Sequence, residues 1–257
     1  MNSLKLLFVL GIVGLSVSCK KSESPINTEA KLLKVTCSFG VGVIDTVNHT
    51  VIIKAPENTD ITQIISQFEI SKNAAIYPPS GVAIDYSNPV TYTITSEDNR
   101  TTKVFKVIVL KPIVKFTVYD CSNWTPTNFG VPQANSTIKI YTKAENGGTE
   151  KIYDTLTTDQ NAQALLYGLK TNDYYLTVIK DSKSNIVNGY VLLGTYNNQG
   201  EVDSSPDSNA KIGGFRFMDW NGDGRINLYD KSNYQVIWGQ YVLNSTGVLL
   251  KDLFIAN

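Results

Sequence analysis

The sequence contains a single histidine, His49, among its 257 residues. A metalloprotease histidine pair is therefore excluded, and so are most acid–base mechanisms that depend on imidazole. An excess of one charge sign is also missing, because Lys plus Arg and Asp plus Glu both number 23. Proteins that neutralise phosphate backbones need a basic excess, so we expect no nucleic-acid partner.

Cysteine is scarce, and no CxxC pair is present that could bind zinc or carry out redox chemistry. Cys37 and Cys121 fall in different predicted modules, and their spacing leaves two alternatives open. They form a disulfide across the junction, or they are two buried, inert thiols. A P-loop, a G-x-S-x-G motif and a complete dinucleotide fingerprint are absent too, so no motif indicates a catalytic site.

The apolar run near the N-terminus, residues 6–15, is too short to be a permanent membrane span. It has about half of the roughly 20 residues that cross a bilayer. Lys5 precedes it, and the small or apolar residues 16–18 lead to Cys19. This order of a basic start, an apolar core and small residues predicts a secretory signal peptide over residues 1–18.

Residues 15–19, Leu-Ser-Val-Ser-Cys, resemble the signal of bacterial lipoproteins. The resemblance implies cleavage before Cys19 and anchoring of the protein in the membrane by acyl chains on that cysteine. The alternative is ordinary secretion with Cys19 as a chance thiol. In Bacteroidetes lipoproteins, acidic residues after the cysteine favour export, and Glu23 fits this pattern. The resemblance thus implies a surface-exposed outer-membrane lipoprotein, in which the polar residues 19–29 form a flexible tether.

Residues 30–111 alternate between short β-branched runs and turn residues, which predicts an Ig-like β-sandwich. The alternation is regular where Val90, Tyr92 and Ile94 share one face of a strand, and a turn at 96–99 leads into a partner strand over 103–110. These two runs predict a hairpin. Helical spacing of isoleucines predicts a short crossover helix over residues 60–68.

The first module also resembles a known family. Pro79-Ser80-Gly81 and the run of residues 88–94, Asn-Pro-Val-Thr-Tyr-Thr-Ile, are similar to Ig-like modules of Bacteroidetes surface lipoproteins. These are packing and turn residues. The resemblance therefore implies a fold and a cell-surface habitat, but no binding site.

A second β-rich module is predicted over residues 112–200, with strands near 114–119, 137–142, 162–167 and 174–179. The run 158–178 resembles transthyretin-like, carboxypeptidase-regulatory-like sandwiches, in which Asn161 and Asp173 here replace family glycines. Both residues tolerate turn conformations. The resemblance implies a spacer or binding scaffold. We therefore expect an all-β protein of two tandem sandwiches, followed by a C-terminal segment over residues 201–257.

The strongest motif for chemistry is residues 219–230, Asp-Trp-Asn-Gly-Asp-Gly-Arg-Ile-Asn-Leu-Tyr-Asp. A calcium loop of about twelve residues supplies oxygens at fixed positions and turns at a glycine in position six, here Gly224. The alternative is an acidic surface loop without metal. The predicted Ca²⁺ ligands are Asp219, Asn221, Asp223, Asn227 and Asp230 through their side chains and Arg225 through its backbone carbonyl.

This loop resembles the calcium loop of dockerins, which also ends in Asp rather than Glu. We expect a strand at Phe215 and Phe217 to enter the loop and a short helix over residues 230–238 to leave it. Only one such loop is present, whereas dockerins that bind a scaffold normally carry two. The ion therefore either locks the C-terminal segment onto the second sandwich or belongs to a docking element.

Because no catalytic residues emerge, we expect a non-enzymatic protein that binds a glycan or another surface protein. Trp124, in the polar loop 122–126, is the best candidate for stacking on a sugar, although half-buried aromatic residues in sandwiches are usually core. The alternatives are a structural spacer or adhesin-like subunit and a dockerin-type docking module. A hydrolase with an unrecognised site ranks last.

Overall fold

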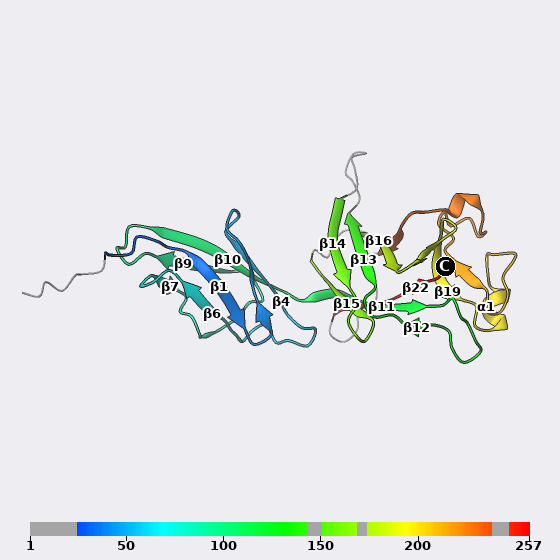
Figure 1. Cartoon of the computed structure of the whole chain (residues 1–257), viewed down its shortest axis with the longest axis horizontal. Helices are drawn as coiled ribbons and strands as arrows, with labels where there is room; N and C mark the ends of the chain where they lie inside the picture. The colour runs from blue at the N-terminus through cyan, green and yellow to red at the C-terminus, as the bar shows by residue number, and fades with distance from the viewer. Residues whose placement is uncertain (1–24, 143–150, 169–173, 238–246) are drawn as a thin grey trace, which may run out of the picture.

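The computed structural model of the chain describes residues 25–142, 151–168, 174–237 and 247–257. They form two β-rich units that lie end to end along the long axis of the molecule (Figure 1). We call residues 25–110 the first unit and residues 112–257 the second unit. The all-β class predicted from the sequence is confirmed. The predicted signal peptide, Cys19 and Asp173 lie outside the described residues.

The first unit consists of short strands: β1 (Leu32–Cys37), β2 (Gly40–Val41), β3 (Val43–Asp45), β4 (Thr50–Lys54), β5 (Ile64–Ile65), β6 (Gln67–Ile70), β7 (Ala75–Tyr77), β8 (Ala83–Ile84), β9 (Val90–Thr95) and β10 (Thr102–Leu110). One sheet has the order β3-β4-β10-β9-β7, a second has the order β2-β1-β6, and β5 pairs with β8. β4 and β10 run parallel, whereas the other pairs in these sheets are antiparallel.

The predicted hairpin is confirmed, because β9 pairs antiparallel with β10 from Thr95 opposite Thr102 to Val90 opposite Val107. Tyr92 and Ile94 are buried, as the alternation predicts. The Tyr92 hydroxyl lies 2.6 Å from that of Tyr86, so the polar ends of these two buried rings satisfy each other. The hairpin therefore forms the middle of the core of the first unit.

The predicted helix over residues 60–68 is wrong, because this stretch contains β5 and the start of β6. Ile64 is buried while Ile65 is exposed, which is the alternation of a strand. β-Branched isoleucines lose side-chain freedom in a helix and pack well on a pleated surface. Pairing of β5 with β8 and of β6 with β1 therefore outweighs a helical spacing of only two turns.

The second unit contains β11 (Pro112–Asp120), β12 (Val131–Pro132), β13 (Thr137–Thr142), β14 (Lys151–Thr157), β15 (Gln163–Tyr167), β16 (Tyr174–Lys180), β17 (Lys183–Ser184), β18 (Ile186–Val187), β19 (Tyr190–Thr195), α1 (Gln199–Asp203), β20 (Phe215–Phe217), β21 (Gln235–Ile237) and β22 (Leu249–Ile255). The strands predicted near 114–119, 137–142, 162–167 and 174–179 are all present. One sheet joins β12, β11, β15 and β22, and another joins β14, β13, β16, β17 and β21. β18, β19 and β20 form a third.

The two larger sheets of the second unit enclose its main core. β11 alternates strictly, with Val114, Phe116 and Val118 buried. β22 pairs parallel with β11 over its whole length and adds Leu253 and Ile255 to the same core. The C-terminal segment thus supplies a strand to the second unit rather than only following it.

The C-terminal segment contains a short helix, as predicted, but not at residues 230–238. A 3-10 helix occupies Leu228–Asp230, at the end of the predicted calcium loop, and β21 follows at Gln235–Ile237. β21 pairs with β16, and this pairing gives its backbone the hydrogen bonds that a helix would otherwise supply. The last predicted helical residue, Trp238, lies outside the described residues.

The junction between the units is short, because β10 ends at Leu110 and β11 begins at Pro112. Lys115 of β11 forms a 2.8 Å ion pair with Glu57 of the first unit. The Tyr167 hydroxyl of β15 donates a 3.1 Å hydrogen bond to the Ala55 carbonyl. Contacts on both sides of the connection therefore hold the units together.

Cys37 and Cys121 are free thiols, so no disulfide crosses the junction; Cys121 is buried as the second alternative expects, whereas Cys37 is only partly buried. Cys121 is buried at the start of the loop after β11, and burial raises the pKa of its thiol to about 12. A thiol with so high a pKa is inert at neutral pH, since the thiolate is the reactive form.

Candidate functional site

The predicted calcium loop, residues 219–230, connects β20 with β21 and lies in the orange part of the chain (Figure 1). The predicted entering strand is present as β20. β20 pairs with β19, and β21 pairs with β16 of a different sheet. The loop therefore bridges two sheets of the second unit.

Asp219 organises the first half of the loop. Its carboxylate accepts hydrogen bonds from the backbone N–H groups of Gly222 at 2.8 Å, Asp223 at 3.2 Å and Gly224 at 2.7 Å. Gly222 and Gly224 have φ values of 70° and 78°, which glycine adopts without strain. One carboxylate thus winds the chain around itself, as a short cation-binding loop requires.

The side chains of two further predicted ligands, Asn221 and Asn227, meet at Asp223, which is itself a predicted ligand. Its Oδ2 atom accepts hydrogen bonds from Nδ2 of Asn221 at 3.1 Å and from Nδ2 of Asn227 at 3.2 Å. Partial desolvation alone would raise the pKa of Asp223, but these amides and the N–H of Arg225 lower it below its ordinary value. The carboxylate is therefore ionised at neutral pH and lies beside two amide groups.

Asp230 is fully buried and closes the loop. Its carboxylate accepts hydrogen bonds from the backbone N–H groups of Trp220 at 2.9 Å, Asn221 at 3.3 Å and Asn227 at 2.7 Å. It also forms a capping box with Asn227 at the 3-10 helix. A buried carboxylate held by three backbone donors fixes the end of the loop to its beginning.

The donor set is chemically suited to Ca²⁺, which prefers carboxylate, amide and carbonyl oxygens. Among the residues that the structure describes, no three His, Cys, Asp or Glu side chains gather closely enough to hold a metal ion by themselves. A cation at this loop would therefore need oxygens of Asn221 and Asn227 and the Arg225 carbonyl as well as carboxylates. In each of the three carboxylates, one oxygen accepts two N–H hydrogen bonds and the other accepts one. The second oxygen, which is Oδ2 of Asp219, Oδ1 of Asp223 and Oδ2 of Asp230, keeps a lone pair for a metal.

Trp124 is half-buried and lies in the loop after β11. Its Nε1 donates a 3.1 Å hydrogen bond to Oδ1 of Asn197. Its ring packs against Gly213, where an added Cβ would lie only 2.7 Å from Cε3 of the indole. Gly213 also has a φ of 79°, so glycine is needed there for both backbone and space. The indole is thus fixed in position rather than freely exposed.

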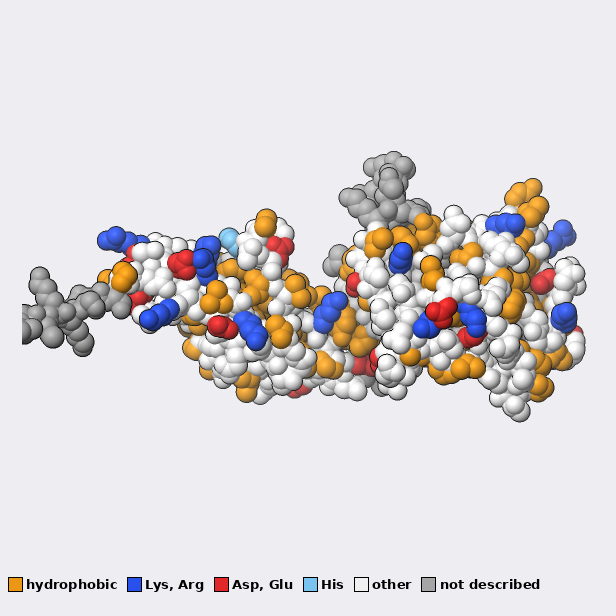
Figure 2. Space-filling model, in the orientation of Figure 1, with side chains coloured by type: hydrophobic (Ala, Val, Ile, Leu, Met, Phe, Trp, Pro, Cys, Tyr) orange, Lys and Arg blue, Asp and Glu red, His pale blue; other side chains and the backbone are white. Residues whose placement is uncertain are grey.

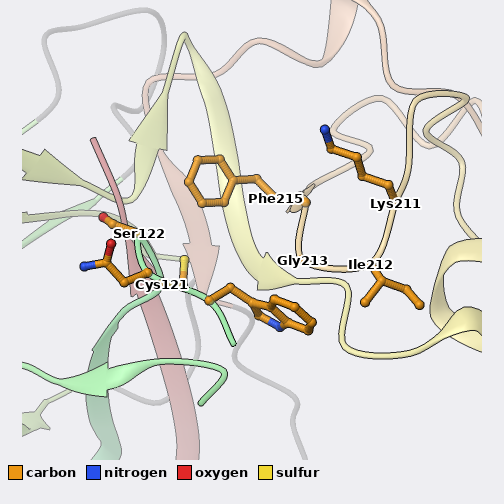
Figure 3. Close-up of a pocket in the computed structure, with 9 residues that line it drawn as sticks. Cys121, Ser122, Lys211, Ile212, Gly213 and Phe215 are labelled. Atoms are coloured by element: carbon orange, nitrogen blue, oxygen red, sulfur yellow. The ribbon is translucent and has the colours of Figure 1, made fainter. Parts of the chain in front are cut away.

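The Trp124 pocket, of about 610 Å³, lies beside this ring. Figure 3 shows Phe215, Gly213, Ile212 and Lys211 on one chain segment, with Cys121 and Ser122 on another. The pocket is lined by residues 121–124 and 211–215. Apolar rings and side chains therefore meet an amide, a hydroxyl and an ammonium group, which is the mixed lining of many ligand sites.

Sequence reasoning identified Trp124 but missed residues 211–215. The two segments are about 90 positions apart, and only the packing of β20 beside β19 brings them together. Gly213-Gly214, two adjacent glycines before an aromatic residue, is the signal that could have indicated a close backbone approach.

Charge does not gather on the face shown in Figure 2. Lys and Arg side chains alternate there with Asp and Glu over both units. This agrees with equal numbers of basic and acidic residues. Among the described residues, no helix has the length and apolar character needed to span a bilayer.

Comparison with protein families gives a match for the first unit. Residues 32–109, in the first unit, match a family described as "SGBP, N-terminal", the N-terminal region of Bacteroidetes glycan-binding proteins. The match covers less than a third of the chain. No curated protein matches.

Two solved structures are similar to parts of the chain. One is provisionally described as a glycoside hydrolase from Bacteroides thetaiotaomicron VPI-5482, with 23% identity and a TM-score of 0.32. That similarity covers 52% of this chain and 36% of the other, so the chain spans about a third of its length. The second is provisionally described as a secreted protein from Bacteroides fragilis NCTC 9343, with 13% identity and a TM-score of 0.27. That similarity covers 33% of this chain and 96% of the other.

Proposed function

We propose that this chain is a non-enzymatic glycan-binding protein of a Bacteroidetes cell surface, anchored to the outer membrane by lipid on Cys19. The match of residues 32–109 to the N-terminal region of glycan-binding proteins supports this class. The lipoprotein-like residues 15–19 support the anchor. The Ig-like first module, the transthyretin-like second module and their boundaries at 111 and 200 belong to the same proposal.

We propose that the glycan binds in the Trp124 pocket. A pyranose ring has apolar C–H faces and a polar edge of hydroxyls, so it binds where an aromatic ring adjoins hydrogen-bonding groups. Trp124 supplies the ring, while Asn123 and Lys211 supply polar groups at the same pocket. The hydrogen bond to Asn197 holds the indole in one orientation, which lowers the entropy lost on binding.

A glycan array probed with the full-length protein tests this function. We expect binding to at least one neutral polysaccharide, and Trp124→Ala should weaken it about tenfold or more, corresponding to about 1.4 kcal/mol. Ile212→Ala should weaken it less, because Ile212 lines the pocket without an aromatic face. Titration calorimetry on the array hit gives both affinities.

Tyr77→Ala is the matched control, because Tyr77 is an exposed aromatic residue of the first unit, 74% exposed on β7. It should leave glycan affinity unchanged. Unfolding curves establish that each variant is folded. A wild-type protein that binds no glycan on the array would contradict the proposed function.

We also propose that Ca²⁺ stabilises the C-terminal segment through Asp219, Asn221, Asp223, Arg225, Asn227 and Asp230. The support is the donor set and the position of the loop between β20 and β21. Three carboxylates in a single, unpaired loop suggest an affinity in the weak extracellular range of about 10⁻⁴ to 10⁻³ M. The ion would fix the connection between two sheets and take no part in glycan binding.

A second candidate function, a structural spacer, is favoured by the junction. Only Lys111 separates β10 from β11, and the Lys115–Glu57 ion pair braces the connection. In that case the chain holds a partner away from the membrane and binds no glycan. The array described above separates the two candidates. A docking module is a third candidate function, because Leu228 and Tyr229 of the calcium loop are exposed apolar residues that a partner protein could cover.

A further inference from the structure

A second pocket is lined by the later part of the loop that carries Trp124. It has a volume of about 310 Å³ and is lined by Tyr119, Thr127, Asn128, Phe129, Asp252 and Phe254, together with Gly130. We call it the Phe129 pocket. None of these residues lines the Trp124 pocket, so residues 121–124 and residues 127–130 of one loop belong to two distinct pockets.

The strand register explains why aromatic rings gather here. β11 and β22 are parallel, and Tyr119 is opposite Phe254. Their ring centroids are 5.8 Å apart and their planes differ by 26°. Gly130 brings the loop backbone over Tyr119, since an added Cβ would lie 3.0 Å from the Tyr119 Cβ. The loop thereby places Phe129, which is 46% exposed, beside these rings.

The pocket also contains an acceptor and a donor that other described residues do not use. Asp252, two positions before Phe254 and therefore on the same face of β22, has no hydrogen bond or ion pair within the described part of the chain. Desolvation raises the pKa of its carboxyl above the ordinary value. The Oδ1 atom of Asn128 accepts the N–H of Gly130 at 3.2 Å, which leaves its Nδ2 as a donor.

We propose that the Phe129 pocket is a second sugar-binding site, which takes one neutral pyranose unit. The sugar packs its C–H face on the aromatic wall, and Asp252 accepts hydrogen bonds from its hydroxyls. This inference rests on the proposed glycan-binding function and adds a site to it. Two sites that share one loop would let the protein hold two parts of a polysaccharide, which raises the overall affinity above that of either site alone.

The polar groups favour a sugar over the main rival, an organic cation. A cation also binds to aromatic rings beside a carboxylate. However, it has no use for the Asn128 Nδ2 donor or the Thr127 hydroxyl, whereas a sugar hydroxyl both donates and accepts. The rings of Tyr119 and Phe254 are also close to parallel rather than arranged as the walls of a cage.

Titration of the full-length protein with neutral trisaccharides of glucose, xylose, galactose and mannose tests the second site. The measurement is made in the Trp124→Ala background, so that only the Phe129 pocket remains. We expect residual binding there, and Phe129→Ala or Asp252→Ala should weaken it about tenfold or more. Both side chains are exposed, so neither change should disturb the fold. Leu250→Ala is the matched control, because Leu250 is exposed on the same face of β22 outside the pocket.

The possible outcomes distinguish a failure of the second sugar-binding site from a failure of the proposed glycan-binding function. If Trp124→Ala alone removes all trisaccharide binding, the second site is overturned while the proposed function stands. If the wild-type protein binds none of the trisaccharides and no glycan on the array, the proposed function fails as well. If tetramethylammonium binds, and Asp252→Ala abolishes that binding while the trisaccharides do not bind the Trp124→Ala protein, the pocket is a cation site and the inference is wrong.

Discussion

The first and second units differ in how completely they satisfy their buried polar groups. In the first unit, buried Ser71 accepts a hydrogen bond from the backbone N–H of Lys31, and Ser66 lies 3.3 Å from the Tyr86 hydroxyl. The described residues contain four buried side-chain polar atoms without a partner, and all four belong to the second unit. They are Ser122 Oγ, Asn185 Nδ2, Arg216 Nε and Gln235 Oε1.

Under the proposed glycan-binding function, this difference favours the second unit as the one that holds the binding sites. An unpaired buried polar atom costs stability unless a ligand or water satisfies it, and such atoms gather at functional sites. Ser122 lines the Trp124 pocket, and Arg216 is on β20 beside it. The match to glycan-binding proteins covers the first unit, yet the two pockets described above are in the second. We therefore expect the first unit to position the second.

The largest effect on stability should come from removing a large side chain from the core of one unit at a time. Phe116→Ala, at a fully buried site of the second unit, should lower its free energy of unfolding by about 3–5 kcal/mol. All three tryptophans lie beyond position 120, so tryptophan fluorescence reports on the second unit alone. Phe105→Ala, its counterpart in the first unit, should leave the fluorescence transition in place. An equal shift in both variants would show that the units unfold together.

Asp230→Ala should have the next largest effect, because it removes the acceptor of three backbone N–H groups in the second unit. We expect a loss of about 3 kcal/mol, on the order of one kcal/mol for each donor left without a partner. The experiment is denaturant unfolding in the presence of EDTA, so that no bound ion contributes. Asp230→Asn keeps one acceptor oxygen and should cost less. A variant as stable as the wild type would contradict the buried role of this carboxylate.

Calcium should stabilise the second unit and not the first. For a Kd near 0.1 mM, 1 mM Ca²⁺ should raise the free energy of unfolding by about 1.4 kcal/mol. Asp223→Ala should abolish this gain, because Asp223 lies beside two other predicted ligands. Asp203→Ala, at an exposed acid outside the loop, should keep it. Identical melting temperatures of the wild type with Ca²⁺ and with chelator would refute the site.

Local patterns in the sequence were sufficient where neighbours in the chain are also neighbours in space. The hairpin of β9 and β10 follows from alternation around Tyr92 and from a four-residue turn, both of which are local. The spacing of residues 219–230 likewise predicts a loop wound by Asp219, although its metal stays a prediction. In each case, the partners of the backbone lie within a few residues.

Prediction failed where distant strands decide the structure. Residues 60–68 and 230–238 have short helical spacings, but pairing with β8, β1 and β16 makes strands of residues 64–65, 67–70 and 235–237. The two pockets could not be predicted from the sequence for the same reason. Trp124 meets Gly213, and Phe129 meets Phe254, only after β20 and β22 have joined sheets formed by earlier residues. No sequence spacing encodes these contacts.

The junction should couple the two units by about 1 kcal/mol, the usual value for a partly exposed ion pair. Lys115 and Glu57 have side chains that are 25% and 16% exposed, so solvent screens their 2.8 Å pair only in part. A double-mutant cycle of Lys115→Met and Glu57→Gln, read by calorimetry, measures the coupling directly. Strictly additive effects would mean that the pair does not join the units.

The smallest effect concerns the hydrogen bonds accepted by two aspartates, Asp98 in the first unit and Asp120 in the second. In the first unit, the pKa of Asp98 is lowered by hydrogen bonds from Ser96 and the N–H of Arg100, both within two residues. In the second, burial alone would raise the pKa of Asp120, but hydrogen bonds from Lys183, 63 positions away, and from Ser122 together lower the pKa below 3.8. The stabilisation from Asp120 therefore exists above pH 3.8 and is lost as the pH falls through the lower, folded-state pKa.

Asp120→Asn should accordingly lower the free energy of unfolding of the second unit by less than about 1 kcal/mol at pH 7. The difference from the wild type should begin to shrink below pH 4, where Asp120 of the unfolded wild type takes up a proton, and should be lost as the pH falls through the lowered pKa of the folded state. Fluorescence-detected urea unfolding at pH 7 and pH 3 measures this. Asp98→Asn should leave the same transition unchanged at both pH values, since its partners belong to one turn of the first unit. A difference that persists undiminished at pH 3 would mean that shape, and not the charge opposite Lys183, explains the effect.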